Sequence, residues 1–292
     1  MHEQPHDAAP ATRPRTGRSI FIDVDGTLID HHGHIPDSAK AAVRAASANG
    51  HWVFLCTGRS RPELWPEITD LGFDGMVAGA GAFAAVGDTE LLHQHLDADQ
   101  INRLADFFTG QGIAYTFEGA YGLFGTRTFR DQLVSKIAEE YPDPDRLAEM
   151  RRGILSFIDR LEDDPRPTRP VSKAMFMFEG GITFDEIREE LSDFHIIGSS
   201  MPSYGYYSGE LQMVGVHKAA GMEAVLNHLG LDPADSVAIG DSDNDVEMMG
   251  YAGLGIAMGN ATPRIKEIAD DITASVTEDG IAKALLRHGL ID

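Results

Sequence analysis

The amino-acid sequence predicts an α/β protein in which an open, doubly wound sheet of parallel strands carries an inserted α+β domain. Two observations predict this fold class. Near both ends of the 292-residue chain, short apolar runs typical of buried strands alternate with helical patterns, as they do when helices connect parallel strands. In the middle, strand-like pieces follow one another with little between them, which is typical of hairpins. The length also fits roughly two domains.

The first β-α-β unit lies near the N-terminus. Residues 20–22 form an apolar run that predicts a buried strand, and residues 52–56 form a second. Between them, apolar residues recur at i, i+3, i+4 and i+7 over residues 39–46, which predicts a helix that Pro36 opens and Gly50 ends. A helix between two buried strands predicts that both strands belong to one parallel sheet.

The C-terminal part repeats this alternation. Its apolar runs predict strands, and its 3.6-residue periodicity predicts the helices between them. The predicted strands are residues 236–239, 255–258 and 272–273, and the predicted helices are residues 222–229, 263–269 and 279–288. We therefore assign this part to the same doubly wound, Rossmann-like core as the first unit.

The middle of the chain predicts an antiparallel sheet with helices on one face. Its strand candidates are residues 84–86, 91–95, 113–118, 122–124, 174–178 and 194–197, and its helix candidates are residues 98–108, 129–140 and 184–191. Three prolines and many charges predict an exposed loop at residues 159–170. We therefore expect residues 83–213 to form the inserted domain, and residues 18–82 and 214–292 to form the core.

Composition restricts the partners and the location. Residues 1–17 are rich in proline, alanine, threonine and histidine and lack periodicity, which predicts a disordered tail. The formal net charge is −22 and no basic patch interrupts it, so we expect no nucleic acid as partner. No apolar run reaches the roughly 18 residues of a membrane span, so we expect no membrane partner. A single cysteine, Cys56, and the lack of a signal-peptide pattern favour a cytoplasmic location, with Cys56 as a buried structural residue.

Three short polar segments each follow the last apolar residue of a predicted parallel strand. Asp23 and Asp25 follow the first strand, Thr57 follows the second, and residues 241–245 follow a late one. Ligands bind outside the carboxyl ends of the strands in such sheets, so we expect these segments to converge on one edge. Two carboxylates two residues apart can divide labour, because one can attack an electrophile while the other moves a proton.

The acidic segment at residues 241–245 indicates a metal. Its oxygen-rich side chains suit a hard cation such as Mg²⁺. Taken one at a time, the acidic segments have a simpler interpretation, since aspartate and glycine favour solvated turns and acidic residues favour helix N-termini. Acidic segments that converge on one edge of a sheet indicate a functional site much more specifically than any one of them does alone.

Together, the segments resemble the motifs of the haloacid dehalogenase (HAD) superfamily of phosphohydrolases. The resemblance is carried by Asp23-Val24-Asp25-Gly26-Thr27-Leu28, Thr57-Gly58-Arg59, Lys218 and Gly240-Asp241-Ser242-Asp243-Asn244-Asp245. The segments 258–261, 269–270 and 278–280 are similar to the Cof-type phosphatase subfamily in particular. The resemblance extends from Ser19 to the C-terminus.

The spacing of the motifs is similar to that of superfamily members with a type IIB cap, an inserted α+β lid. From Asp25 to Thr57 is 32 residues, which one β-α-β crossover fills. From Thr57 to Lys218 is 161 residues, which leaves room for an insert. The resemblance thus implies that residues 83–213 are the cap.

The resemblance implies a role for each catalytic residue. Asp23 would be the nucleophile that becomes an aspartyl phosphate. Asp25 would protonate the leaving group and then deprotonate the attacking water. Thr57, Gly58 and Lys218 would bind the phosphoryl oxygens, and the lysine would also neutralise the nucleophile.

The resemblance also implies a magnesium site. Mg²⁺ would be held by the Asp23 carboxylate, the Asp25 backbone carbonyl and Asp241, with Asp245 in support. The cation is required because the nucleophilic carboxylate and a phosphate dianion repel each other. Asn244 would contact the phosphate or orient the lysine.

The implied function is a Mg²⁺-dependent phosphatase that acts on a small phosphorylated metabolite of the sugar phosphate, pyridoxal phosphate or flavin mononucleotide class. The alternatives are a phosphotransferase or phosphomutase of the same superfamily and a non-catalytic phosphate-binding regulator. Sugar phosphomutases of the superfamily carry their cap in the first linker, which is too short here. The candidate substrate contacts in the cap are Tyr115, Arg127, Lys173 and Tyr204. Ala80 departs from many Cof-type members, which have asparagine at that position.

Overall fold

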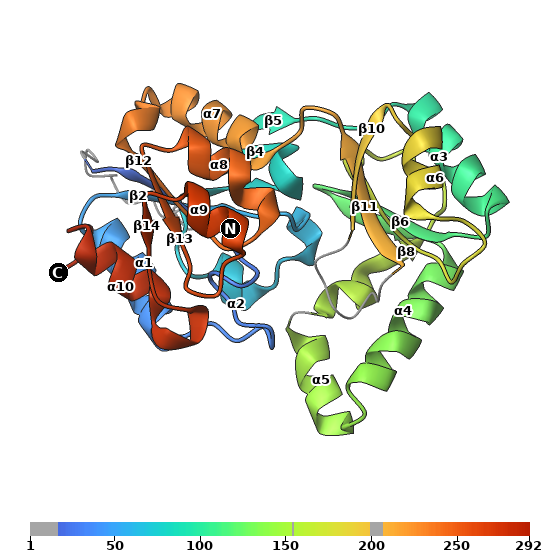
Figure 1. The fold of residues 1–292 in the computed structure, drawn as a ribbon, viewed down its shortest axis with the longest axis horizontal. Coiled ribbons are helices and arrows are strands. Elements are labelled where there is room, and N and C mark those ends of the chain that lie inside the picture. Colours follow the sequence, from blue (N-terminus) through green and yellow to red (C-terminus); the bar gives the residue numbers. More distant parts are fainter. Residues whose placement is uncertain (1–16, 154, 199–206) are drawn as a thin grey trace, which may run out of the picture.

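The structure, a computed structural model, describes residues 17–153, 155–198 and 207–292 (Figure 1). Its strands form one sheet of eight strands and another of six. The tail predicted at residues 1–17 lies outside the described residues, apart from Gly17. Of the described helices, none is both long enough and apolar enough to cross a membrane.

The eight-stranded sheet is built from the two ends of the chain. Its order is β14-β13-β12-β1-β2-β3-β4-β5, and all neighbours from β14 to β3 are parallel. The chain winds outward in both directions from the central pair of β1 and β12, which confirms the predicted doubly wound fold class. The strands are β1 (Ser19–Ile22), β2 (Trp52–Cys56), β3 (Gly75–Ala78), β4 (Phe83–Val86), β5 (Thr89–His93), β12 (Ser236–Gly240), β13 (Leu254–Ala257) and β14 (Asp271–Ile272).

Helices cover both faces of this sheet. Figure 1 shows α1 and α10 on one side of it, with α7, α8 and α9 on the other. In α1, the buried residues are the small apolar ones whose helical spacing predicted the helix. The helices are α1 (Asp37–Ala48), α2 (Pro66–Thr69), α7 (Lys218–Leu229), α8 (Val246–Tyr251), α9 (Pro263–Ile268) and α10 (Gly280–Arg287). The short 3₁₀ turns are η1 (Arg61–Glu63), η2 (Gly79–Gly81), η5 (Pro233–Asp235), η6 (Asp243–Asp245) and η7 (Val276–Glu278).

The six-stranded sheet is built from the middle of the chain, in the order β10-β11-β9-β6-β7-β8. Its neighbours are antiparallel, apart from β7 and β8, which are parallel. The strands are β6 (Ala114–Gly119), β7 (Gly122–Gly125), β8 (Leu161–Asp163), β9 (Lys173–Met177), β10 (Phe194–Gly198) and β11 (Ser208–Met213). The helical elements are α3 (Ala98–Gly110), α4 (Arg127–Glu140), α5 (Pro144–Arg152), η3 (Ser156–Arg160) and α6 (Phe184–Glu190).

Two expectations for the middle of the chain are wrong. Helices cover both faces of its sheet: Tyr115 belongs to the apolar cluster of α3 and α6, whereas Ala114, its neighbour along β6, belongs to the cluster that contains Leu133 of α4. Successive strand residues point to opposite faces, and both faces here are apolar, so the pattern did not reveal the second layer. The predicted loop at residues 159–170 also contains β8, a strand too short to show an alternating pattern.

The predicted start of the insert at residue 83 is wrong as well. The hairpin of β4 and β5 pairs antiparallel with β3, so residues 83–93 extend the eight-stranded sheet. A sequence shows that two strands lie close enough to form a hairpin, but it does not show which sheet the hairpin joins. The strands of the other sheet start at β6.

Ala80 lies between β3 and β4 in a left-handed conformation, with φ 55° and ψ 26°. For a residue with a Cβ atom this conformation costs about 1–2 kcal/mol, whereas glycine adopts it freely and asparagine tolerates it. Its neighbour Gly81 has φ 106°, and a Cβ atom there would stand 2.0 Å from the backbone oxygen of His217. The strained turn therefore packs directly against the start of α7.

We expect Ala80→Gly to raise the free energy of unfolding by up to about 1 kcal/mol, because relief of the left-handed strain exceeds the added entropy of the unfolded chain. Urea denaturation measures this change. The matched control is Ala78→Gly, at a buried extended residue with φ −128°, which should lose stability. A loss in both variants would contradict the strain at Ala80.

Candidate active site

The turn after β1 places two aspartates at the carboxyl end of the sheet. The backbone N–H of Asp23 donates to the carbonyl oxygen of Ile239 at 2.9 Å, so β1 is joined to β12 up to this residue. Asp23 is buried, whereas the Asp25 side chain is 46% exposed. At Gly26, which has φ 82°, a Cβ atom would stand 2.3 Å from Oδ2 of Asp241. A glycine is therefore required for the first and the late segments to approach each other.

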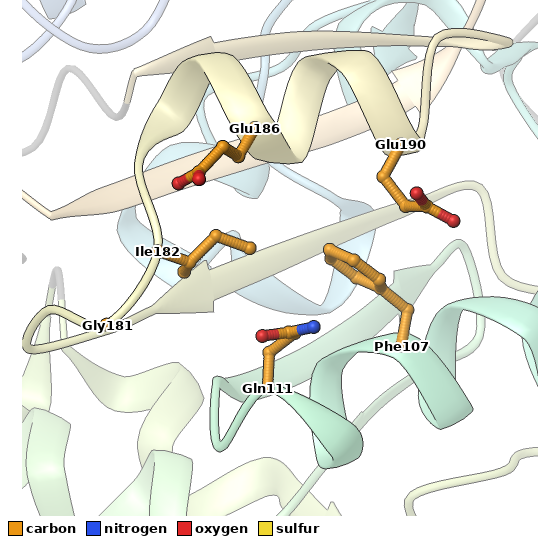
Figure 2. Close-up of a pocket in the computed structure, with 6 residues that line it drawn as sticks. All are labelled: Phe107, Gln111, Gly181, Ile182, Glu186 and Glu190. Carbon is orange, nitrogen blue, oxygen red and sulfur yellow. The ribbon is translucent and has the colours of Figure 1, made fainter.

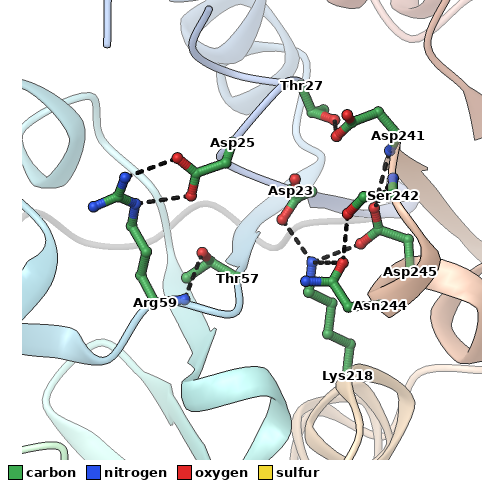
Figure 3. Close-up of polar contacts among 10 residues, drawn as sticks. All are labelled: Asp23, Asp25, Thr27, Thr57, Arg59, Lys218, Asp241, Ser242, Asn244 and Asp245. Atoms are coloured by element: carbon green, nitrogen blue, oxygen red, sulfur yellow. Dashed lines mark hydrogen bonds and ion pairs between the residues drawn. The ribbon is translucent and has the colours of Figure 1, made fainter. Parts of the chain in front are cut away.

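Lys218 reaches the turn from the first residue of α7. Its ammonium nitrogen donates to Oδ1 of Asp23 at 2.6 Å, to Oδ1 of Asp245 at 2.6 Å and to Oδ1 of Asn244 at 3.2 Å (Figure 3). The His217 side chain caps α7 by accepting from a backbone N–H, which fixes the helix end that carries the lysine. The lysine side chain is fully buried. A buried ammonium is stable only when its charge is paired, and here two carboxylates pair it.

The electrostatics of the Asp23–Lys218 pair follow from burial and from the neighbouring carboxylates. Burial favours the neutral form of Lys218, yet Asp23 and Asp245 outweigh it and raise the lysine pKa. Burial raises the pKa of Asp23, Lys218 lowers it, and the surrounding aspartates raise it further. The site thus holds more negative charge than the single ammonium neutralises, which favours the entry of a cation.

Asp245 organises the acidic segment. Its Oδ2 accepts from the backbone N–H groups of Asp241 and Ser242, at 2.9 and 3.0 Å, while its Oδ1 accepts from Lys218. The Ser242 hydroxyl donates to Oδ1 of Asn244 at 2.8 Å, which aims the asparagine oxygen at the lysine. Both oxygens of Asp245 are thus engaged by donors of the chain itself. Its geometry is that of a residue that holds the segment and the lysine in place.

Asp241 lies closer to the surface and faces the first turn. Its Oδ1 accepts from the hydroxyl of Thr27 at 3.0 Å, and its Oδ2 lies 3.4 Å from the side-chain nitrogen of Asn260. Burial, with Asp245 nearby, raises the pKa of Asp241 to about 7. Thr27 and Asn260 were not identified from the sequence. The signal for Thr27 was its place inside the first motif, and the signal for Asn260 was its place just beyond a predicted parallel strand.

The segment after β2 contributes the third side of the site. The backbone N–H of Thr57 donates to Val77 at 2.8 Å, and the Thr57 hydroxyl accepts from the backbone N–H of Arg59 at 3.1 Å. A Cβ atom at Gly58 would stand 3.3 Å from the side-chain nitrogen of Asn244. Thr57 and Gly58 therefore lie beside the acidic segment, as expected.

Arg59 has a partner that the sequence did not reveal. Its Nε and one terminal nitrogen each donate to Asp25 at 2.8 Å, which makes a two-bonded ion pair (Figure 3). The guanidinium also lies over the ring of Trp65, at 5.4 Å from the ring centroid. This ion pair joins the segment after β2 to the turn after β1.

The structure also places the residues that lie outside this group. Burial raises the pKa of the Cys56 thiol, which agrees with the predicted buried, unreactive cysteine. Among the candidate contacts in the insert, Tyr115 points into the core of α3 and α6, Lys173 is buried in ion pairs, and Arg127 is exposed beside Asp163. Tyr204 lies outside the described residues.

A pocket beside the six-stranded sheet, on the face that carries α3 and α6, is separate from this site. It lies between α3 and α6, and none of the residues above lines it (Figure 2). Its lining residues are Phe107, Gln111, Gly181, Ile182, Glu186 and Glu190.

Three carboxylates of the site fit a divalent cation. Oxygen atoms of Asp23, Asp241 and Asp245 all lie within 4.8 Å of one another. Over the described ranges, this is the single group of three or more carboxylates, histidines or cysteines whose ligand atoms all lie so close together. An all-oxygen donor set suits Mg²⁺ rather than a thiolate-preferring metal.

Fold and site together define a class of enzymes in which a buried carboxylate follows the first strand of a doubly wound sheet and meets a lysine and further carboxylates there. The chain belongs to the haloacid dehalogenase-like hydrolases, because the model of that family matches residues 20–285. The predicted superfamily and the prediction of a hydrolytic enzyme are thereby confirmed.

Similar proteins agree with this assignment. YkrA of Bacillus subtilis (strain 168), named as a candidate phosphatase, is 30% identical over 93% of this chain and 98% of its own. YcsE of the same strain, named 5-amino-6-(5-phospho-D-ribitylamino)uracil phosphatase, is 29% identical over 93% of this chain and 95% of its own. The solved structure of BT4131, a HAD subclass IIB sugar phosphatase, has the same fold, with a TM-score of 0.72 at 24% identity over 94% of this chain and 100% of its own.

Proposed function

We propose that the protein is a Mg²⁺-dependent phosphatase that hydrolyses a small phosphorylated metabolite through an aspartyl-phosphate intermediate. The observation that carries the proposal is the contact of Lys218 with Asp23, 2.6 Å apart and buried at the carboxyl end of β1. A buried carboxylate held by an ammonium is oriented for attack and is neutralised against an incoming phosphate dianion. Family membership and the phosphatase names of the relatives support the same reaction.

The reaction has two steps on the residues of this chain. In the first, which starts from the protonated form of Asp25, an oxygen of Asp23 attacks phosphorus, the bond from phosphorus to the ester oxygen breaks, and Asp25 gives its proton to the departing alkoxide. In the second, Asp25 takes a proton from water, the water oxygen bonds to phosphorus, and the bond to Asp23 breaks. The products are the alcohol and inorganic phosphate, and both carboxylates return to their starting states.

The phosphoryl oxygens are bound by the hydroxyl of Thr57, the N–H of Gly58 and the ammonium of Lys218. These donors stabilise the charge that spreads over the phosphoryl group in the transition state. Of the two roles expected for Asn244, its 3.2 Å contact with Lys218 supports the orientation of the lysine.

Mg²⁺ would be held by the carboxylates of Asp23 and Asp241 and by the backbone carbonyl of Asp25. When bound, the cation offsets the repulsion between the nucleophile and the phosphate dianion. Asp245 would support the metal site by holding its neighbours in place, since its oxygens accept from Lys218 and from the backbone of the acidic segment.

We further propose a division into a core and a cap. The core comprises residues 18–93 and 214–292, which contain the eight-stranded sheet, and the cap comprises residues 94–213. A cap over the carboxyl ends of the strands would exclude bulk water during phosphoryl transfer and would select the alcohol part of the substrate. The named activity of YcsE supports a substrate of the expected kind, in which a phosphorylated chain is joined to a ring system.

A steady-state assay with a small aryl phosphate, with and without Mg²⁺, tests the proposal. We expect release of inorganic phosphate only when Mg²⁺ is present, and a panel of sugar phosphates, pyridoxal phosphate and flavin mononucleotide then identifies the substrate class. Transfer of the phosphoryl group to a second alcohol without net release would indicate a phosphotransferase. Binding without turnover would indicate a phosphate-binding regulator.

Removal of the metal gives a second prediction. We expect activity to vanish with a chelator and to return with Mg²⁺, and we expect Asp241→Ala to weaken the Mg²⁺ activation constant sharply. Titration of activity and calorimetry with Mg²⁺ measure both effects. The matched control is Asp243→Ala, an exposed aspartate of the same segment, which accepts from Thr262 and should leave the activation constant unchanged. Full activity after removal of all divalent metal would contradict the proposed cation.

A further inference from the structure

A buried cluster of charged side chains lies where the cap meets the segment after Gly58. It consists of Glu63 of η1 in the core and Glu118, Lys173 and Glu210 on three neighbouring strands of the six-stranded sheet. Glu118 is 2% exposed and Lys173 is 3% exposed. The proposed reaction uses none of these groups. Burying three carboxyl groups around one ammonium is costly, so the cluster requires an explanation.

The contacts within the cluster join the six-stranded sheet to the segment after β2. The Lys173 ammonium lies 3.1 Å from Oε2 of Glu118 and 3.2 Å from Oε2 of Glu210, and both glutamates belong to the cap. Glu118 crosses to the core, where its Oε2 accepts from the Ser60 hydroxyl at 3.4 Å and its carboxyl group lies beside that of Glu63. Two carboxyl groups can hydrogen-bond to each other only when one of them carries a proton. Burial and the charge of Glu63 raise the pKa of Glu118, against the opposing effect of Lys173.

A short path leads from this cluster to the proposed acid–base residue. Oε2 of Glu63 accepts from the backbone N–H of Ser60 at 2.6 Å. Ser60 directly follows Arg59, whose guanidinium makes two 2.8 Å bonds to Asp25. Each oxygen of Asp25 keeps a second lone pair, so the carboxylate can exchange a proton while the arginine holds it. The position of Arg59 therefore depends on a loop that a cap residue contacts.

We propose that Glu118 is a positioning residue for the hydrolysis: it shares one proton with Glu63 and thereby holds the loop of residues 59–63 so that Arg59 orients Asp25 when the cap is docked. The role of Asp25 rests on the proposed function, whereas the contact between cap and core does not. Asp25, the acid–base carboxylate, is then fully oriented only while the cap covers the site.

Because of the shared proton, the contact between cap and core depends on pH. The charged and polar groups that face Glu118 are Glu63 and Ser60 from the core and Lys173 and Glu210 from the cap. As the pH rises through the raised pKa of Glu118, the group ionises next to Glu63, and Lys173 is already shared with Glu210. The docked arrangement is therefore favoured at lower pH and weakens as the pH rises.

Three variants test the positioning role with a small aryl phosphate as substrate. Glu118→Ala should lower kcat by at least about tenfold with little change in KM, because it misplaces Asp25 without removing a substrate contact. Glu118→Gln keeps a donor toward Glu63 and should retain kcat, without the alkaline loss of activity. Glu162→Ala, at an exposed glutamate of β8 in the same cap, is the matched control and should behave as the wild type.

The route through Arg59 is tested by a double-mutant cycle. Glu118→Ala should add little to the loss caused by Arg59→Ala, because both changes release the same carboxylate. Independent losses that multiply would overturn the route, and so would a Glu118→Ala variant with wild-type kcat. A Glu118→Gln variant as impaired as Glu118→Ala would show that the ionised form, and not the shared proton, is required.

Docking is also measured without activity. Spin labels at Asn227→Cys of α7 and Glu189→Cys of α6, both at exposed positions, report the distance between core and cap, while the native Cys56 is buried. We expect a narrow distance distribution in mildly acidic buffer that broadens in alkaline buffer, broad distributions for Glu118→Ala, and narrow ones for Glu118→Gln at both pH values. An unchanged wild-type distribution across this range would overturn the proposal. If the distances behave as expected and no phosphatase activity is found, the proposed function fails and the contact remains.

Discussion

Asp23→Asn is expected to lower turnover by several orders of magnitude. The substitution preserves the shape of the side chain but removes the charge needed to attack phosphorus, and two neighbouring aspartates are already engaged by other groups of the chain. Asp245 has both oxygens bound by the chain, and Asp25 is held by Arg59. The measurement is single-turnover release of inorganic phosphate from a small aryl phosphate.

The Asp23→Asn variant should remain folded and should still bind its substrate. Lys218 keeps Asp245 and Asn244 as partners, so the buried ammonium is not left unpaired. Thermal unfolding and equilibrium binding of the substrate are the controls. Turnover within about tenfold of the wild type would contradict the role of Asp23 as nucleophile. The loss of the covalent step should slow turnover by much more than tenfold.

Lys218→Ala is expected to lower kcat/KM by about two to three orders of magnitude for every substrate alike. The ammonium contacts the phosphoryl group that all substrates share, and it neutralises Asp23 before attack. Cap substitutions that touch the alcohol part of the substrate should instead change KM and leave kcat largely unaltered. The measurement is kcat/KM for one large and one small phosphate ester.

Stability must be followed in the same Lys218→Ala variant. Removal of the lysine side chain leaves Asp23 and Asp245 buried without the ammonium that pairs with them. We therefore expect a loss of about 3–5 kcal/mol in the free energy of unfolding. Lys283→Ala, at an exposed lysine of α10, is the matched control and should change neither activity nor stability. A loss of activity confined to the large substrate would contradict a contact with the shared phosphoryl group.

The core of the fold was predictable because its strands are buried on both faces. Apolar runs such as residues 20–22, 52–56 and 236–239 stand out in the sequence, and the polar segment beyond each run marks the carboxyl end of a strand. The same rule placed the three polar segments at one edge of one sheet. The structure brings their side chains into contact, although their roles in catalysis remain predictions.

The parts that were not predictable depend on contacts between distant residues. The hairpin of β4 and β5 has the same local pattern whichever sheet it joins, and only its pairing with β3 decides. Arg59 and Asp25 are 34 residues apart. Glu63 lies in the turn η1 of the core and Glu118 in β6 of the cap, and no periodicity marks a buried carboxyl pair. Such polar partners are set by tertiary packing, which composition and spacing do not record.

The central claim is that Asp23 is the residue that receives the phosphoryl group. Its most direct test is to quench the enzyme during turnover with borohydride, which reduces an acyl phosphate to an alcohol, and to sequence the peptides by mass spectrometry. We expect homoserine in place of aspartate at position 23, formed only with substrate and Mg²⁺ present and absent in Asp23→Asn. Homoserine at another position, or none at any position under conditions of full turnover, would contradict it.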